Sequence, residues 1–270
     1  MKHFLFSLII IMSFSLFGFS QSTTSSNDSI FNKIDAKGQK QGVWKRYYKN
    51  GKMRYHGQFK DDKPFGEFNY YTEDGKLESN LKYVKGTFAK AIYYQPNGKV
   101  LGYGNYIDNK KDSLWKFYND LGVLVSEEFY KNFKKNGLFK VYYYTGELSE
   151  QVNWMNDKKN GSNKEFFKDG KIKLEANYKD DCFDGVFKIY YSTGKLKTQG
   201  YFKNCTRDGK WVKYRENGTF KMVETFKNGQ LIKTEDLRTK EEIEREKPVK
   251  DIPIDVPDPG KSDYRGPGNQ

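Results

Sequence analysis

The chain has 270 residues, a formal net charge of +13 and a mean hydropathy of −0.92. This lean, polar composition excludes a multi-span membrane protein, whereas an aromatic content of 17% excludes a chain that is disordered throughout. Two cysteines are too few for a disulfide-dense scaffold or a four-cysteine zinc site.

The first twenty residues have the pattern of a secretory signal peptide. Lys2 and His3 precede an apolar run, and the small residues Gly18 and Ser20 stand just before a predicted cleavage site at Gln21. The run is short for a membrane span and is interrupted by serines. We therefore expect residues 1–20 to be removed and the mature chain to be secreted or periplasmic.

A period of 24 residues dominates the rest of the sequence. It is clearest in eight glycines that mostly follow Asn or Asp, and one interval is 23 residues. The turn glycines are Gly51, Gly75, Gly98, Gly122, Gly146, Gly170, Gly194 and Gly218. Columns four residues before and two and eight residues after each glycine are apolar or aromatic in all eight units. Such a register indicates tandem repeats.

Each unit is predicted to be a strand, a three-residue turn ending in glycine, a second strand and a polar loop. One hairpin cannot bury a face alone, so neighbouring hairpins must stack. The sequence thus predicts an all-β fold: an elongated antiparallel sheet or solenoid of eight hairpin repeats over residues 42–230.

Two segments, GVWKRYYKNGKM (42–53) and GKWVKYRENGTF (209–220), show the repeat pattern most clearly. At these residues the chain resembles the variant form of the MORN (membrane occupation and recognition nexus) repeat. The resemblance implies an elongated antiparallel sheet with a binding or scaffolding role and no catalytic residues. The unit at 89–100 departs from the pattern at Ala89 and Ala91, and the unit at 161–172 departs at Asn163.

The flanking segments complete the predicted organisation. Residues 21–41 form an N-terminal linker, and 231–270 form a tail. Residues 233–247 have a helix-forming composition, with a capping box at Thr239 and Glu242. The proline-rich remainder is expected to be extended and disordered.

The column seven residues before each turn glycine, called here the −7 column, supplies candidate binding residues. Alternation along the strand places it on the opposite face from the aromatic column four residues before the glycine. If that face is exposed, its rings could stack on sugars, hold choline-like cations or dock a protein; alternatively, twist closes both faces into core. The candidates are Trp44, Phe68, Trp115, Phe139, Phe187 and Trp211.

Lysine pairs in the polar loops are the second set of candidates. Stacked hairpins would place them along one edge, where they could bind lipid head groups or acidic glycans; they could equally confer solubility and block edge pairing. The pairs are Lys110 and Lys111, Lys134 and Lys135, and Lys158 and Lys159.

Cys182 and Cys205 lie in successive loops, 23 residues apart. Loops two strands apart are separated by about 9.6 Å, beyond the distance of about 7 Å that a disulfide spans. A bridge therefore requires the loops to bend toward each other, and both the bridged and the free-thiol forms stay open.

No enzyme activity, catalytic residue, metal site or cofactor is expected. His56 is the one histidine beyond the leader, and neither a Walker A sequence nor a dinucleotide-binding fingerprint occurs. We expect a scaffold at a bacterial cell envelope that binds a protein or an anionic surface. The alternatives are a carbohydrate- or choline-binding cell-wall module and an antitoxin-like protein with a toxin partner. Nucleic acid is a poor candidate, because the leader directs the chain out of the cytoplasm.

Overall fold

The computed structural model describes residues 31–245, which lie within one compact unit, Ile30–Lys247. The expected signal peptide and the proline-rich part of the tail fall outside the described residues.

Twenty strands make up almost the whole of this unit. They are β1 (Lys33–Ile34), β2 (Lys40–Tyr47), β3 (Met53–Lys60), β4 (Lys63–Tyr71), β5 (Leu77–Lys85), β6 (Phe88–Tyr94), β7 (Val100–Ile107), β8 (Lys110–Tyr118), β9 (Leu124–Lys131), β10 (Lys134–Lys135), β11 (Gly137–Tyr142), β12 (Leu148–Met155), β13 (Lys158–Phe166), β14 (Ile172–Lys179), β15 (Cys182–Phe183), β16 (Gly185–Tyr190), β17 (Leu196–Lys203), β18 (Thr206–Tyr214), β19 (Phe220–Lys227) and β20 (Gln230–Asp236). One short helix, α1 (Lys240–Arg245), follows.

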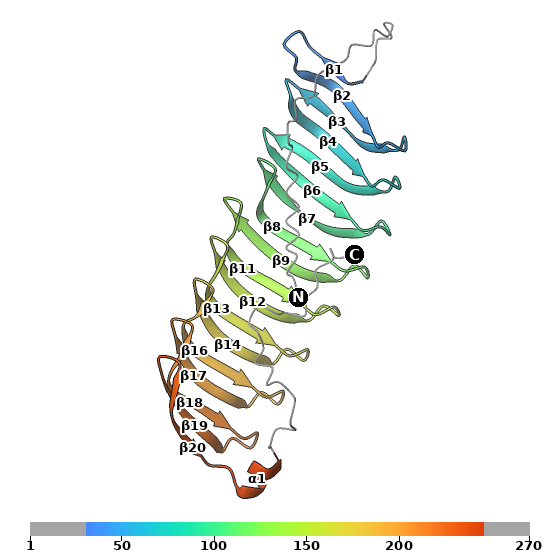
Figure 1. The fold of residues 1–270 in the computed structure, drawn as a ribbon. Coiled ribbons are helices and arrows are strands. Elements are labelled where there is room, and N and C mark those ends of the chain that lie inside the picture. The colour runs from blue at the N-terminus through green and yellow to red at the C-terminus, as the bar shows by residue number, and fades with distance from the viewer. Residues whose placement is uncertain (1–30, 246–270) are drawn as a thin grey trace. The chain divides into compact units, whose positions relative to one another are not determined.

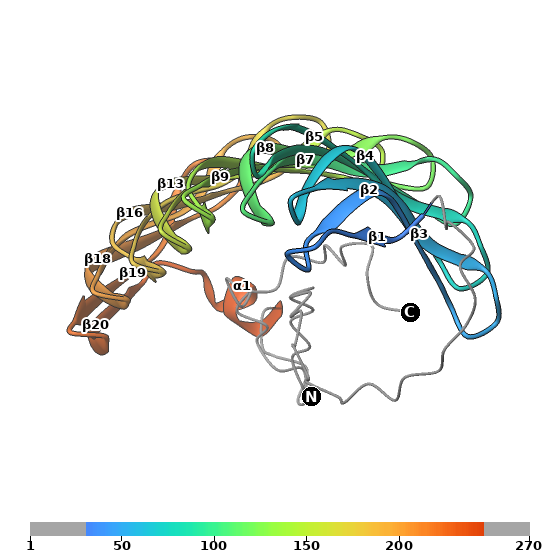
Figure 2. The ribbon, with the colours of Figure 1, turned by 90° about the horizontal axis from the view of Figure 1, so that it is seen from above.

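The strands form one antiparallel sheet in which each strand pairs with its neighbours in sequence. Figure 1 shows β1 and β20 at opposite ends of the sheet, and Figure 2 shows the strands as a single curved layer. The all-β architecture of stacked hairpins predicted from the sequence is confirmed.

The glycine turns have the predicted three-residue form. In the first repeat the Gly51 N–H donates to the Tyr48 carbonyl at 3.0 Å, and the Tyr48 N–H donates to the Lys52 carbonyl at 2.8 Å. Gly51 has a φ of 81°, a left-handed conformation that glycine adopts without steric cost. A bulge after Arg46 then places Tyr47 opposite Met53, as the column pairing predicted.

The segments predicted as polar loops are instead tight second turns. Lys60 pairs with Lys63, so only Asp61 and Asp62 connect β3 to β4, and both have positive φ. Two consecutive left-handed residues define the type I′ hairpin turn, which Asn and Asp tolerate better than most residues. The repeats are therefore joined as one continuous meander.

Both ends of the sheet extend beyond the predicted repeat region. β1 pairs with the start of β2, so the segment expected to be a linker is partly structured. At the other end, β20 pairs with β19 over residues where we expected helix, and α1 begins only at Lys240. Hydrogen bonds to the backbone of β19 stabilise a strand at these residues by more than their intrinsic propensity favours a helix. The capping box is confirmed, because the Glu242 N–H donates to Thr239 Oγ1 at 3.2 Å and Glu242 Oε2 accepts from the Thr239 N–H at 2.7 Å.

The core lies on one face of the sheet and consists mainly of aromatic rings, many of which pack edge to face. Trp44 contacts Phe59 with ring centroids 5.9 Å apart, and Phe59 contacts Phe68 at 5.2 Å. A second series runs through Phe187, Phe202 and Trp211 near the other end. Edge-to-face ring contacts stabilise the folded state by more than the burial of their apolar surface alone.

Candidate functional surface

The six aromatic residues of the −7 column are buried, so the prediction that they form an exposed contact row is wrong. Trp115 is 0% exposed, Phe68 and Trp211 are 2% exposed, and the other three are between 4% and 9% exposed. The alternative drawn from the sequence, that both faces close into core, is correct for this face only, because Leu114 and Phe129 on the opposite face are each 40% exposed. The rings proposed to stack on sugars or choline-like cations are therefore not accessible to such a ligand.

Glycines make this burial possible in a single sheet. Gly57, Gly104 and Gly200 lie under the rings of Phe68, Trp115 and Trp211, where an added Cβ would stand 2.2–2.3 Å from a ring carbon. Each large ring can therefore lie flat on the backbone of the preceding strand. This glycine column, six residues after the turn glycine, was not predicted from the sequence to have a role.

The lysine pairs divide into an inner and an outer member. The inner lysines lie over core rings: Lys111 Nζ is 4.8 Å from the Trp115 ring centroid, and Lys135 Nζ is 4.6 Å from that of Trp154. Lys159 lies 5.1 Å from the ring of Tyr178. Burial lowers the pKa of Lys111. These three ammonium groups cover the core through cation–π contacts and are not a free basic surface.

The outer lysines, Lys110, Lys134 and Lys158, are exposed at the second turns. Lys158 pairs with Asp180 at 3.8 Å, and Lys110 lies over the Phe133 ring at 4.6 Å. The predicted basic edge thus carries less exposed positive charge than the sequence indicated. Only one lysine of each pair is exposed, and acidic turn residues alternate with these lysines.

On the face opposite the core, directly paired residues form an ionic row across the strands. Lys116 pairs with Glu127, and Glu127 pairs with Lys140. The two lysine Nζ atoms lie 3.0 and 3.4 Å from the Glu127 carboxylate, and the Tyr142 hydroxyl donates to it at 3.0 Å. Burial opposes ionisation of Glu127, but the hydrogen bonds from Lys116 and Tyr142 outweigh it and lower its pKa. This glutamate is therefore held charged.

An exposed apolar patch borders the ionic row. Leu114 pairs directly with Phe129, and both are 40% exposed. Leu138 is 41% exposed and follows Gly137, at which an added Cβ would lie 3.4 Å from the Phe129 ring. These three residues are called the apolar patch below. An apolar centre beside a charged rim is the usual anatomy of a protein interface.

The apolar patch was not predicted from the sequence. Its residues stand eight before and seven after a turn glycine, and they alternate with the charged residues of the row. Those columns carry polar residues in most other repeats, for example Lys82 and Asn177, so no periodic signal marks them. A search for repeats that depart from their column could have found the patch.

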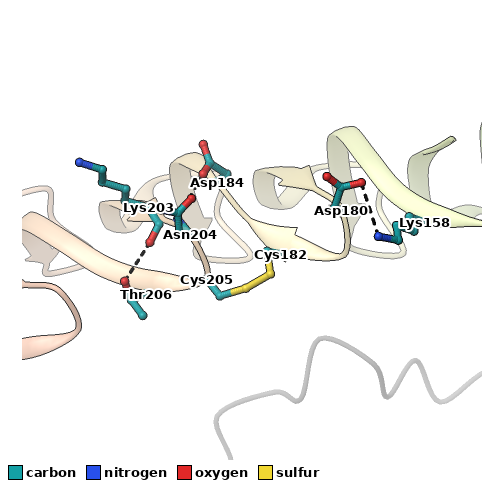
Figure 3. Close-up of a disulfide and its surroundings, with 8 residues drawn as sticks. All are labelled: Lys158, Asp180, Cys182, Asp184, Lys203, Asn204, Cys205 and Thr206. Atoms are coloured by element: carbon teal, nitrogen blue, oxygen red, sulfur yellow. Dashed lines mark hydrogen bonds and ion pairs between the residues drawn. A yellow bond between two sulfur atoms is a disulfide. The ribbon is translucent and has the colours of Figure 1, made fainter.

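Cys182 and Cys205 form a disulfide with a Cα–Cα distance of 4.8 Å. The separation of about 9.6 Å expected between loops two strands apart was too large. The turn that carries Cys205 bends toward the turn that carries Cys182, so the two cysteines come within bonding distance. The Cys205 N–H donates to the Phe183 carbonyl at 3.1 Å, which draws the two turns together. Figure 3 shows the bridge between them.

His56 is held by neighbouring polar side chains on the face opposite the core. Its Nε2 lies 3.3 Å from Asn69 Nδ2, and its ring stacks on that of Tyr71. Within residues 31–245 no group of three His, Cys, Asp or Glu side chains is placed to hold a metal ion. No helix in that same range is long and apolar enough to cross a bilayer.

These features define an open-sheet β-hairpin repeat protein. The sequence pattern of the MORN repeat variant matches five segments, at residues 40–61, 111–132, 135–156, 159–180 and 183–204. These five segments are therefore similar to the MORN repeat variant, as the resemblance implied. The other hairpins follow the same period without matching that pattern.

No curated protein matches the chain. Among solved structures it is similar to a TarM mutant of S. aureus, at 15% identity and a TM-score of 0.27, over 35% of this chain and 19% of TarM. It is also similar to the Tc holotoxin pore of Photorhabdus luminescens (12% identity, TM-score 0.20, 72% of this chain and 12% of that one). A porin-like protein from Bacteroides uniformis is 8% identical at a TM-score of 0.18, over 71% of this chain and 92% of that one. The chain spans about a fifth of the length of TarM.

Proposed function

We propose that this protein is a non-enzymatic scaffold that binds a protein partner through the apolar patch and its ionic rim. The observation that carries the proposal is the contiguous exposure of Leu114, Phe129 and Leu138 on a sheet face whose other side is closed by core rings. MORN repeats favour a repeat-based binding role. Protein surfaces rarely expose neighbouring large apolar residues without a function.

The ionic rim supports a protein rather than a lipid or glycan surface as the partner. Lys116 and Lys140 both bond to the one carboxylate of Glu127, so only one positive charge of this row is left uncompensated. A polyanion would need free positive charge, whereas compensated charges serve to exclude wrong partners and fix orientation.

We place the protein outside the cytoplasm, in a periplasm or at a cell envelope. The leader pattern of residues 1–20 supports this localisation. The Cys182–Cys205 disulfide also supports it, because disulfides form and persist in oxidising compartments.

The test is a pull-down from the cell-envelope fraction of the source organism with the full mature chain, at low and high salt. The patch variant carries Leu114→Ser and Phe129→Ser together. Leu121→Ser is the matched control, because Leu121 is 63% exposed at a glycine turn away from the patch. Circular dichroism establishes that all three chains are folded.

We expect one protein to be recovered at both salt concentrations by the wild type and the control, and to be lost with the patch variant. Electrostatic contacts between exposed groups weaken with salt, but apolar contacts do not. Recovery of lipid or glycan that disappears at high salt, or equal recovery by all three chains, would refute the proposal.

A further inference from the structure

Aspartates at the second turns clasp neighbouring repeats together. Asp157 Oδ1 accepts from the Lys135 N–H at 2.8 Å, and the Asp157 N–H donates to the Lys135 carbonyl at 3.1 Å. The same two-way clasp joins Asp181 to Lys159, at 2.8 and 3.0 Å, and Asp62 to Lys40, at 2.8 and 3.2 Å. The aspartate always stands eleven residues after a turn glycine.

At the junction of β14 and β15 with β17 and β18, a cysteine takes the place of this aspartate. Cys205 stands eleven residues after Gly194 and has the same left-handed φ, 67° against 68° for Asp181. Its N–H keeps the bond to the Phe183 carbonyl. The bond that the carboxylate makes elsewhere is replaced by the covalent bond to Cys182, the residue before Phe183.

The residue held by this bridge also departs from the pattern. Phe183 stands where the other clasped repeats have Lys40, Lys135 or Lys159. Its ring stacks on Tyr178 at 4.4 Å and contacts Phe187 at 5.3 Å and Phe202 at 5.2 Å. The disulfide therefore fastens an aromatic ring that closes this part of the core.

We propose that Cys182–Cys205 is a modification site: a thiol-exchangeable clasp whose reduction by a dithiol loosens this one repeat junction. Cys205 is exposed at the turn, and an open hollow of about 230 Å³ reaches Cys182 beside Asp184 and Asn204. In the view of Figure 3, no other labelled side chain overlaps the bond between the two sulfur atoms. The aspartate clasps elsewhere contain no group that a thiol could attack.

The exchange is a two-electron reaction. One thiolate of the dithiol attacks Cys205 Sγ, the S–S bond breaks, and its electron pair leaves on Cys182 Sγ, which takes a proton. The second thiol of the reagent then attacks the mixed disulfide and releases the Cys205 thiolate, which is protonated in turn. The dithiol ends as a disulfide, and the protein ends with two thiols.

The experiment treats the oxidised full-length mature protein with dithiothreitol, without denaturant, and blocks new thiols with iodoacetamide. Mass spectrometry counts the blocked cysteines, and hydrogen exchange is followed over residues 180–187 and 203–208. Residues 132–139, at the Asp157 clasp, serve as the internal reference. The double variant Cys182→Ser with Cys205→Asp restores the aspartate pattern, and Cys182→Ser with Cys205→Ser removes both kinds of clasp.

We expect both cysteines to be blocked, and exchange at the junction to rise about tenfold on loss of the bridge, with no change at the reference. The aspartate variant should be protected with or without reductant, whereas the serine variant should exchange like the reduced wild type. A disulfide that is reduced only in denaturant would overturn the proposal. So would a reduced protein, or a serine variant, that exchanges as slowly as the oxidised protein.

Discussion

Gly104→Ala should destabilise the sheet, although it adds only one methyl group. The new Cβ would lie 2.3–2.5 Å from carbons of the Trp115 ring, which is fully buried. The ring would have to lift, straining its 3.0 Å hydrogen bond from Nε1 to the Asn105 carbonyl and its contact with Tyr106 at 5.0 Å. Overpacking of this kind costs about 1–3 kcal/mol, and a weakened hydrogen bond adds about 1 kcal/mol.

A double-mutant cycle with Trp115→Ala isolates that clash. In the background without the ring, Gly104→Ala should be neutral or should stabilise by about 0.4–1 kcal/mol, since alanine restricts the unfolded chain. Urea unfolding followed by circular dichroism gives the four free energies, and a coupling of about 2–4 kcal/mol is expected from the terms above. Equal effects of Gly104→Ala in the two backgrounds would refute the account of how a single sheet buries this face.

Three further predictions concern the charged groups. Burial raises the pKa of Glu150 and outweighs the opposing charge of a nearby lysine. The contribution of Glu150 to stability is therefore present at acid pH and is lost as the pH rises through the raised pKa. Glu150→Gln should stabilise the protein at neutral pH but not near pH 4, and urea titrations at the two pH values measure the difference. Lys135→Met should lower the free energy of unfolding by about 1 kcal/mol, because it removes the cation–π contacts of Lys135 with Phe139 and Trp154. Lys134→Met at an exposed turn should change it by less than about 0.5 kcal/mol, and urea titrations at neutral pH measure both effects. Asp157→Ala should speed hydrogen exchange at the Lys135 amide about tenfold, whereas Asp157→Asn, which keeps an oxygen acceptor, should have a much smaller effect.

The repeat period, the hairpins and the glycine turns were predictable because each is specified locally. A glycine with left-handed φ recurs in every unit, together with the aromatic and aliphatic residues that flank it, so all eight units predict the same hairpin. The second turns were mistaken for loops because their residues, such as Asp61 and Asp62, are equally typical of both.

The choice of buried face depended on contacts between strands, which the alternation of one strand does not reveal. Rings such as Trp115 are buried because Gly104 lies under them and Lys111 covers them, and these three residues come from different columns. The disulfide was left open for the same reason: strand spacing gives no hint that Cys205 folds back onto Phe183. The apolar patch is a departure from the repeat rather than part of it, and periodicity cannot predict a departure.

Site-specific photo-crosslinking tests the central functional claim most directly. A photoreactive phenylalanine analogue replaces Phe129 in the full chain, and the same analogue replaces Leu121 in a control chain; both are exposed, but only Phe129 is in the apolar patch. Illumination of intact cells should yield a covalent adduct with one protein from position 129 and none from position 121. Adducts with lipid or glycan alone, or the same protein adducts from both positions, would contradict a scaffold that docks its partner through this patch.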